Sequence, residues 1–371
     1  MNNEINTYFL GGNILAVHGG NTEEIARKYK INSSEIIDFS ANINPLGLNE
    51  NVKAAMINAI DKVIKYPDIT YFDLKNSIGE FEKLNTSNIM LGNGAAEVIF
   101  NIARALKPRK ALLPAPTFSE YEEAITSVNG EIEYYKLKES NNFKLDNEFI
   151  NRIKDNIDII FICNPNNPTG VLTTQEFIRE VLKKAITTNT VVVVDESFLD
   201  FVKQNEMYLS NKLLSDYKNL IIVKSLTKFF AIPGARIGYG LCLNNEIINK
   251  ISKVTVPWSV NIMASDGIIQ GLKEKDYIEK SIEYVENEKE YLYSALKEVK
   301  SLKVFEPSVN FIMFKLLIDF DLKNELIKRK ILIRNCDNYI GLSDRFYRVA
   351  VRTREENNKL ISEIKNILFD K

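Results

Sequence analysis

The segment DIIFICNPNNPTG, residues 158–170, decides the fold. Its first half is almost entirely apolar, which is typical of a strand buried on both faces of a parallel sheet. Its second half is polar and rich in proline and glycine, which is typical of a loop. The same arrangement recurs: Asp195-Glu196 follows the apolar run 191–194, and Ser225-Leu226-Thr227-Lys228 follows the run 220–224. Polar side chains therefore come directly after three expected strands.

Helices and strands alternate on both sides of this segment. Alternation, together with strands that are apolar on both faces, predicts an α/β fold with a mainly parallel central sheet covered by helices. The expected strands are 110–113, 131–137, 158–163, 191–194, 220–224 and 236–243, and the expected helices are 95–106, 119–128, 145–154 and 174–186.

The pattern changes toward both ends of the chain. Residues 1–45 are rich in Asn and Gly and contain one expected helix, 22–29, so they form an arm that packs on a smaller domain or on a dimer partner. Residues 46–260 form the large domain, and 261–371 form a long helix and a small α+β domain. Within the latter region we expect a helix over 260–299 with one break, strands 302–305, 309–317, 331–334 and 346–351, and helices 322–330 and 355–369.

Composition excludes several classes of protein. The 371 residues include 48 Lys and Arg against 49 Asp and Glu, so no basic surface for nucleic acid is expected. No apolar stretch approaches the ~18 residues of a membrane span, and the first ten residues do not resemble a secretion signal, so a cytoplasmic location is expected. The single histidine, His18, and three scattered cysteines support neither a metal site nor a Ser or Cys triad.

The polar groups after the strands suit pyridoxal 5′-phosphate, because the carboxyl ends of parallel strands meet in one crevice. Lys228 can form the covalent link to the cofactor aldehyde, Asp195 can pair with the pyridine nitrogen, and Asn167 can donate to the phenolate oxygen. Ser225 and Arg236 would hold the cofactor phosphate. Lys224 is the rival lysine, but it lies inside an expected strand.

These motifs resemble the fold-type I, aspartate-aminotransferase-like enzymes that depend on pyridoxal phosphate, and the resemblance runs through most of the chain. It implies that Phe118 stacks on the pyridine ring, and that Tyr66 reaches the cofactor phosphate of the other subunit of a homodimer. It also implies a group of residues around the cofactor phosphate, comprising Gly94, Ala95, Ala96 and Thr227. The sequence departs from many relatives at Ala96, where Ser or Thr is common, and at Phe198, where a tyrosine is common.

Two C-terminal arginines point to the substrate. Arg348 resembles the family arginine that grips the α-carboxylate with its planar fork. Arg334 lies near the position where histidinol-phosphate aminotransferases place a substrate-phosphate arginine. Two arginines imply a substrate with two anionic ends, which we take to be a phosphorylated amino acid.

Within the family, the segments HGGN at 18–21, DFSANINPLG at 38–47 and RVAVRT at 348–353 look more like threonine-phosphate decarboxylases. Histidinol-phosphate aminotransferases usually have Glu in place of Ile43 and Gly in place of Arg352. The resemblance implies decarboxylation of L-threonine O-3-phosphate to aminopropanol phosphate for cobalamin-type cofactors, with further substrate contacts from His18, Gly19 and Asn42. The alternatives are a histidinol-phosphate aminotransferase using 2-oxoglutarate, an L-serine O-phosphate decarboxylase, and a regulatory protein that binds pyridoxal phosphate without catalysis.

Overall fold

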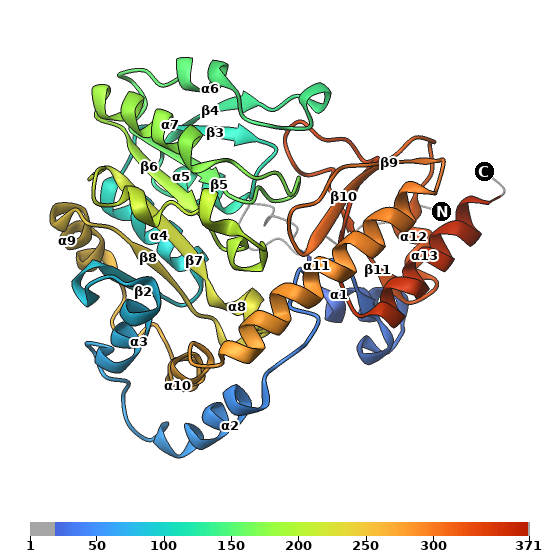
Figure 1. Cartoon of the computed structure of the whole chain (residues 1–371), viewed down its shortest axis with the longest axis horizontal. Helices are drawn as coiled ribbons and strands as arrows, with labels where there is room; N and C mark the ends of the chain where they lie inside the picture. The colour runs from blue at the N-terminus through green and yellow to red at the C-terminus, as the bar shows by residue number, and fades with distance from the viewer. Residues whose placement is uncertain (1–18, 370–371) are drawn as a thin grey trace.

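The computed structural model of the chain describes residues 19–369, and its centre is a seven-stranded sheet (Figure 1). Strand β8 runs antiparallel to both of its neighbours, and every other neighbouring pair is parallel. The predicted mainly parallel sheet is therefore confirmed. In spatial order the strands are β2 (Ile89–Gly92), β8 (Gly238–Leu241), β7 (Leu220–Ser225), β6 (Val191–Asp195), β5 (Ile159–Cys163), β3 (Lys110–Ala115) and β4 (Glu131–Lys136).

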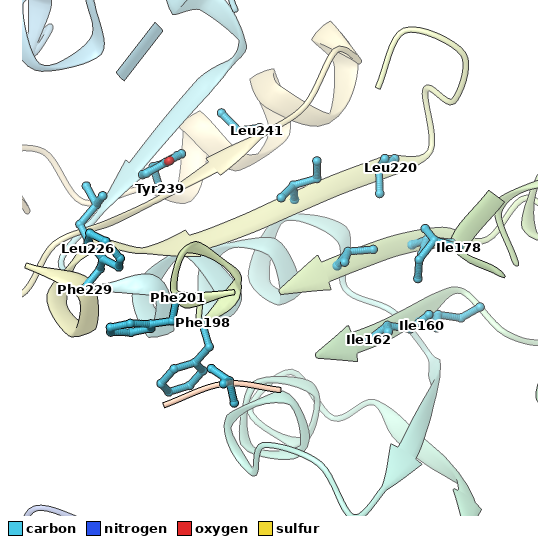
Figure 2. Close-up of a cluster of buried hydrophobic side chains, with 14 of the residues drawn as sticks. Ile160, Ile162, Ile178, Phe198, Phe201, Leu220, Leu226, Phe229, Tyr239 and Leu241 are labelled. Carbon is cyan, nitrogen blue, oxygen red and sulfur yellow. The ribbon is translucent and has the colours of Figure 1, made fainter. Parts of the chain in front are cut away.

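The sheet is buried on both faces, as the apolar strands predict. Alternate residues of one strand enter different cores: Ile160 and Ile162 join one hydrophobic cluster, while Ile159 and Phe161 join another. Figure 2 shows part of the first cluster, which extends from Ile160 and Ile162 to Phe198 at the edge of the candidate site. The elements packed around the sheet include α4 (Ala95–Leu106), α5 (Glu120–Thr126), α6 (Asn147–Asn151), α7 (Gln175–Thr187), α8 (Leu226–Phe229) and α9 (Asn245–Val254).

A second, four-stranded antiparallel sheet lies toward the C-terminus. Its order is β12 (Arg334–Asn335), β13 (Phe346–Ala350), β10 (Phe311–Leu316) and β9 (Leu302–Val304). Helices α12 (Leu322–Ile327) and α13 (Arg354–Leu368) belong to this part. The long helix α11 (Lys275–Lys297) runs from the region of the large sheet to the small one, and Figure 1 shows it crossing between them.

The expected broken helix over 260–299 is confirmed, because α10 (Ile262–Gly271) ends shortly before α11 begins. Helix α1 (Thr22–Tyr29) is also confirmed at its predicted ends. Sequence reasoning did not identify α2 (Glu50–Asn58) or α3 (Phe72–Glu82). In α2 the only buried residue is Val52, so the apolar periodicity that marks a helix is weak there.

Two predicted elements illustrate how the structure differs from the prediction. The expected strand 331–334 is divided at Ile333: β11 (Ile331–Leu332) pairs in parallel with β1 (Ile37–Asp38), and β12 pairs with β13. Each half thus satisfies its backbone groups in a different sheet. The expected helix 145–154 is reduced to α6, because the Asp146 side chain accepts a hydrogen bond from the Glu148 N–H and fixes a later start.

Several sequence predictions lie beyond these observations. His18 is outside the described residues, and so is the rest of the predicted arm before Gly19. The domain boundaries after residues 45 and 260 stay predictions. In the part of the chain that the structure describes, no helix is long and apolar enough to cross a membrane, and no group of His, Cys, Asp and Glu could hold a metal ion.

Candidate active site

A cavity of about 720 Å3 opens at the carboxyl ends of β5, β6 and β7. The polar groups that follow these strands in the sequence meet here, as the topology of a parallel sheet predicts. Residues from the N-terminal and C-terminal parts of the chain complete the wall. Predicted site residues on this wall are Gly19, Asn42, Ala95, Ala96, Phe118, Asn167, Asp195, Ser225, Thr227, Lys228, Arg236 and Arg348.

Lys228 lies on α8, which begins immediately after β7. Buried Leu226 and Phe229 anchor this single helical turn, and they leave the lysine on the cavity wall. Its Nζ donates to the Thr227 hydroxyl at 3.2 Å. Burial, with the positive charge of Arg236, lowers the pKa of Lys228 to about 8, although the Asp195 carboxylate opposes the shift. About a tenth of this amine is therefore neutral, and so nucleophilic, at pH 7, which is far more than for a lysine of ordinary pKa.

Asp195 is the last residue of β6 and is 3% exposed. Its Oδ2 accepts a hydrogen bond from the Tyr121 hydroxyl at 2.8 Å, and its Oδ1 accepts one from the Ser197 N–H at 2.9 Å. Burial raises the pKa of Asp195, while these hydrogen bonds and Lys228 work against the rise. A buried carboxylate of this kind is suited to a cationic partner such as a protonated pyridine nitrogen.

Asn167 and Arg348 are in contact on the wall. The Asn167 Oδ1 accepts a hydrogen bond from the Arg348 Nη1 at 2.5 Å and a longer one from the Tyr339 hydroxyl. The Arg348 Nη2 donates to the Ser40 carbonyl at 2.7 Å, so the guanidinium is held from two sides. Its buried Nε has no hydrogen-bond partner among residues 19–369. The arginine is thus positioned by neutral groups, and its charge is available to an anion.

The start of α4 forms a cradle next to Arg236. Gly94 precedes the helix with φ +88°, and a Cβ added there would lie 2.6 Å from the Arg236 Nη2. Backbone N–H groups at the start of a helix attract phosphate, and the close approach of Arg236 adds a positive charge. Ala95 and Ala96 belong to the wall, and Ala96 has no side-chain hydroxyl to offer. This combination suits a phosphate group bound mainly by backbone donors and arginine.

Two aromatic residues border the cavity. Phe118 packs edge-on against Tyr121, with ring centroids 5.6 Å apart. The Phe198 ring centroid lies 5.9 Å from the Lys228 Nζ, so the residue that replaces the common tyrosine is beside the lysine but offers no hydroxyl. The departure noted in the sequence therefore falls at the centre of the site.

Other predicted residues lie elsewhere. Tyr66 is 81% exposed and packs against Trp258 with ring centroids 5.0 Å apart, outside the cavity of its own chain. Arg334 is buried and is not among the described residues that line the cavity, but its guanidinium is 5.5 Å from the ring centroid of the wall residue Tyr339. Lys224 is buried in ion pairs with Glu82 and Asp200, each at 3.0 Å. These pairs give the rival lysine a structural role.

Sequence reasoning did not assign several wall residues, among them Ser40, Ser197 and Tyr339, nor the buried Tyr121 behind Asp195. Ser40 lies inside the quoted segment 38–47, so its neighbourhood was marked. Tyr121 lies three residues after Phe118, a spacing that places both on one face of a helix start. Tyr339 follows β12 in an irregular segment, and no pattern in the sequence marks it.

The profile of class I and II aminotransferases matches residues 34–364, most of the chain. The chain belongs to this family. It is 34% identical to the threonine-phosphate decarboxylase of Salmonella typhimurium over 95% of this chain and 97% of the relative. It is also 39% identical to the adenosylcobalamin biosynthesis bifunctional protein of Leptospira interrogans, over 96% of this chain but only 41% of that longer protein.

Solved structures of family members share the fold. The histidinol-phosphate aminotransferase from Clostridium acetobutylicum superposes with a TM-score of 0.85 at 34% identity, covering 90% of this chain and 99% of that chain. The histidinol-phosphate aminotransferase from Sinorhizobium meliloti, solved with pyridoxal 5′-phosphate, superposes with a TM-score of 0.84 at 18% identity, covering 94% and 95%. The cofactor of this family is pyridoxal 5′-phosphate, and the cavity must therefore be tested for its fit.

The residues present fit that cofactor. Lys228 offers an amine of lowered pKa, Asp195 a buried carboxylate, and Gly94 a cradle that a side chain would fill. When bound, pyridoxal phosphate supplies an electron sink for a bond that breaks at the substrate Cα. Lys228 would hold its aldehyde, Asp195 its pyridine nitrogen and Arg236 its phosphate. These assignments agree with those made from the sequence and stay predictions.

Proposed function

We propose that the chain decarboxylates L-threonine O-3-phosphate to (R)-1-aminopropan-2-yl phosphate, for the nucleotide loop of cobalamin-type cofactors. The names of the Salmonella and Leptospira relatives support this activity and this pathway. In the reaction the bond from Cα to the carboxylate breaks, CO2 leaves, and a proton takes its place on Cα. No oxidant or keto acid is needed.

One observation carries the choice of decarboxylation over transamination. Ile43 and Arg352 are the two positions at which the sequence departs from the usual histidinol-phosphate aminotransferase pattern, and both lie on the cavity wall. Where histidinol-phosphate aminotransferases usually have the carboxylate of a Glu, this chain has Ile43, and where they usually have Gly, it has the guanidinium of Arg352. The cavity wall is therefore more positive than it would be with the usual Glu and Gly. A more positive wall favours a substrate that carries both a phosphate and a carboxylate.

Each nearby side chain has a defined task in this proposal. Arg348, held by Asn167 and the Ser40 carbonyl, would orient the α-carboxylate. Arg334, whose guanidinium lies 5.5 Å from the ring centroid of the wall residue Tyr339, would contribute to the phosphate end. Lys228, once released from the cofactor, would return the proton to Cα. Asn42, whose buried Oδ1 has no partner among residues 19–369, and Gly19 would complete the substrate wall.

The runner-up is a histidinol-phosphate aminotransferase with 2-oxoglutarate, which the fold and 34% identity of the Clostridium structure favour. A decarboxylase for L-serine O-phosphate is a minor alternative, because one methyl group changes binding by only ~1–3 kcal/mol. Transamination needs a keto acid for sustained turnover, and decarboxylation does not. This difference separates the two main reactions.

The deciding experiment measures CO2 released from L-threonine O-3-phosphate by the enzyme loaded with pyridoxal phosphate, without a keto acid. Parallel reactions contain L-serine O-phosphate, or histidinol phosphate with 2-oxoglutarate, and Lys228→Ala is the inactive control. Sustained CO2 release from threonine phosphate is expected. Glutamate formation from histidinol phosphate, with no CO2 from threonine phosphate, would establish the aminotransferase instead.

A homodimer belongs to the same proposal. The surface around Tyr66 is apolar, with Val63, Ile64 and Ile69 each more than half exposed, and a patch of this kind is usually covered by a partner. A second copy seated here would bring each Tyr66 toward the other cofactor site. Sedimentation should show a dimer, and Ile64→Glu should dissociate it, whereas a monomeric wild type would reject the proposal. A cytoplasmic location stays a prediction of the sequence.

A further inference from the structure

We propose that Arg352 binds the phosphate group of the substrate, as a second arginine of the substrate pocket beside Arg348. The inference rests on the proposed function, since it takes the substrate to be a phosphorylated amine. The relevant juxtaposition is that of two arginines, four residues apart, on one cavity wall. Arg348 lies inside β13, whereas Arg352 follows its end.

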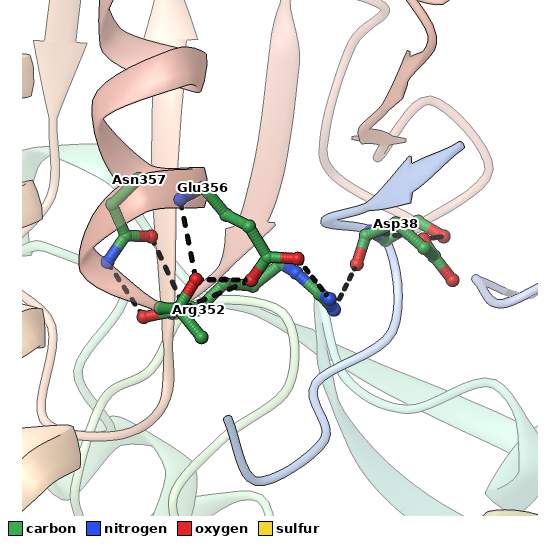
Figure 3. Close-up of polar contacts among 6 residues, drawn as sticks. Asp38, Arg352, Glu356 and Asn357 are labelled. Carbon is green, nitrogen blue, oxygen red and sulfur yellow. Dashed lines mark hydrogen bonds and ion pairs between the residues drawn. The ribbon is translucent and has the colours of Figure 1, made fainter. Parts of the chain in front are cut away.

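Arg352 is held in place by two hydrogen-bond acceptors. Its Nη2 donates to the Glu356 Oε1 at 2.7 Å, and its Nη1 donates to the Asp38 carbonyl at 3.0 Å. Figure 3 shows the guanidinium lying between these two groups. Among the described residues, Arg352 and Asp38 line the cavity but Glu356 does not. Glu356 therefore orients the arginine without occupying the space that an anion would fill.

The guanidinium keeps unused donors. An arginine has five N–H groups, and the two hydrogen bonds above use two of them. Its Nε is buried and has no hydrogen-bond partner among residues 19–369. The side chain is 28% exposed, so it reaches the open space of the cavity. Donors in a fixed planar fork match the oxygens of a phosphate.

Charge also favours an anion at this position. The Asp38 carboxylate is already engaged, because its Oδ1 accepts hydrogen bonds from the Ser40 N–H at 2.7 Å and the Ser40 hydroxyl at 2.5 Å. The Gly20 N–H donates to the same Ser40 hydroxyl at 2.8 Å. Among the described residues, Glu356 is the only carboxylate in an ion pair with Arg352. A phosphate dianion could be shared by Arg352 and a second cation. The substrate phosphate thus has a preformed partner on the Asp38 side of the cavity.

The test measures binding rather than turnover. O-Phosphoethanolamine carries a phosphate but no carboxylate, and ethanolamine carries neither, so neither can lose CO2. Both are titrated into the loaded enzyme, and the change in cofactor absorbance gives a Kd for each. The Kd of ethanolamine divided by the Kd of O-phosphoethanolamine is the preference for phosphate. Arg352→Gln should lower this ratio roughly 10- to 100-fold, as expected for a lost hydrogen bond to a charged group.

Glu356→Gln is the matched control. It keeps the capping box of α13, because Gln can replace Glu there, and it keeps Arg352. The phosphate preference should stay within about threefold of wild type. Equal losses in Arg352→Gln and Glu356→Gln would overturn the inference, because they would show that Arg352 acts only as a structural link. An unchanged preference in Arg352→Gln would also overturn it.

Arg352→Lys covers the case in which Arg352→Gln does not fold. It keeps the positive charge but loses the planar guanidinium. The phosphate preference should therefore lie between the values for wild type and Arg352→Gln. If only the lysine variant folds, its phosphate preference should lie below that of wild type. Neither ligand releases CO2, so a lowered phosphate preference in Arg352→Gln supports the inference even if threonine phosphate is not decarboxylated. The two proposals can therefore fail separately.

Discussion

Replacing Lys224 by Met tests whether the structural and cofactor-binding roles of the two neighbouring lysines are separate. The Lys224 side chain is 4% exposed, and its Nζ lies 3.0 Å from both the Glu82 and the Asp200 carboxylates. Burial alone would lower the pKa of Lys224, but these carboxylates raise it well above its ordinary value. A raised pKa means that the stabilisation is fully present at pH 7 and is lost only at strongly alkaline pH.

The expected magnitude follows from the group left behind. Glu82 is also 4% exposed and would keep only the hydrogen bond from the Tyr239 hydroxyl. Removing one partner of a buried ion pair costs about 3–5 kcal/mol. The chain can limit this cost by protonating a carboxylate, which costs ~3.7 kcal/mol at pH 7 but only ~1 kcal/mol at pH 5 for an ordinary glutamate pKa of ~4.3. Lys224→Met should therefore lose about 3–4 kcal/mol at pH 7 and distinctly less at pH 5.

The assay is urea unfolding of wild type and variant at both pH values, with the double variant Glu82→Gln/Lys224→Met as control. The double variant removes the unpaired carboxylate and should recover at least half of the loss. At pH 8, where about half of Lys228 is neutral, the folded Lys224→Met protein should still take up pyridoxal phosphate and retain it after borohydride reduction. A loss below 1 kcal/mol at pH 7, or an equal loss at pH 5, would refute the reasoning; failure to retain the cofactor would reinstate Lys224 as its lysine.

Three further predictions concern pH. Capture of pyridoxal phosphate by the apoenzyme needs a neutral Lys228, so the capture rate should rise with pH with a midpoint near 8. Asp195→Asn should lower that midpoint, because the Asp195 carboxylate raises the pKa of Lys228. A midpoint above 10 in the wild type would contradict the prediction. Phe198→Tyr adds a donor beside the lysine and should lower the pKa read from the cofactor spectrum in a pH titration, whereas an unchanged spectrum would show that the hydroxyl does not reach the cofactor. Burial raises the pKa of Glu196 to about 7, so stability should fall as pH rises from about 4.5 to 7, and Glu196→Gln should flatten this slope in urea unfolding.

The central sheet could be predicted because the pattern that marks each strand lies within a short stretch of sequence. Strands such as Val191–Asp195 are apolar on both faces, and a polar group follows each one, so both the layer and the position of the site can be read from the chain. Lys228, Asp195 and Asn167 lie together on the cavity wall for that reason. Their assignment to cofactor atoms came from resemblance as well as from this geometry.

What could not be predicted depends on contacts between distant segments. The division at Ile333 arises because β1, almost three hundred residues earlier, pairs with β11. Tyr121 approaches Asp195 only when β6 and α5 are packed together, and no spacing in the sequence encodes that hydrogen bond. Arg334 matched a family position, yet it is not among the described residues that line the cavity, because the local sequence pattern does not determine which surface a long side chain reaches.

The arginines that would recognise the substrate also act on Lys228. Arg236 and Arg348 both lower the pKa of this lysine, so an anion that neutralises Arg348 must raise it. The empty site therefore holds more of the neutral amine, which can attach the cofactor, than the site filled by an anionic substrate. Filling the site increases the share of the ammonium, which can return a proton to Cα. The same positive charges would thus shift the lysine first toward the amine and then toward the ammonium. Adding phosphate to the apoenzyme should move the midpoint of cofactor capture to higher pH in wild type and less in Arg348→Gln, and an equal shift in both would show that the coupling does not pass through Arg348.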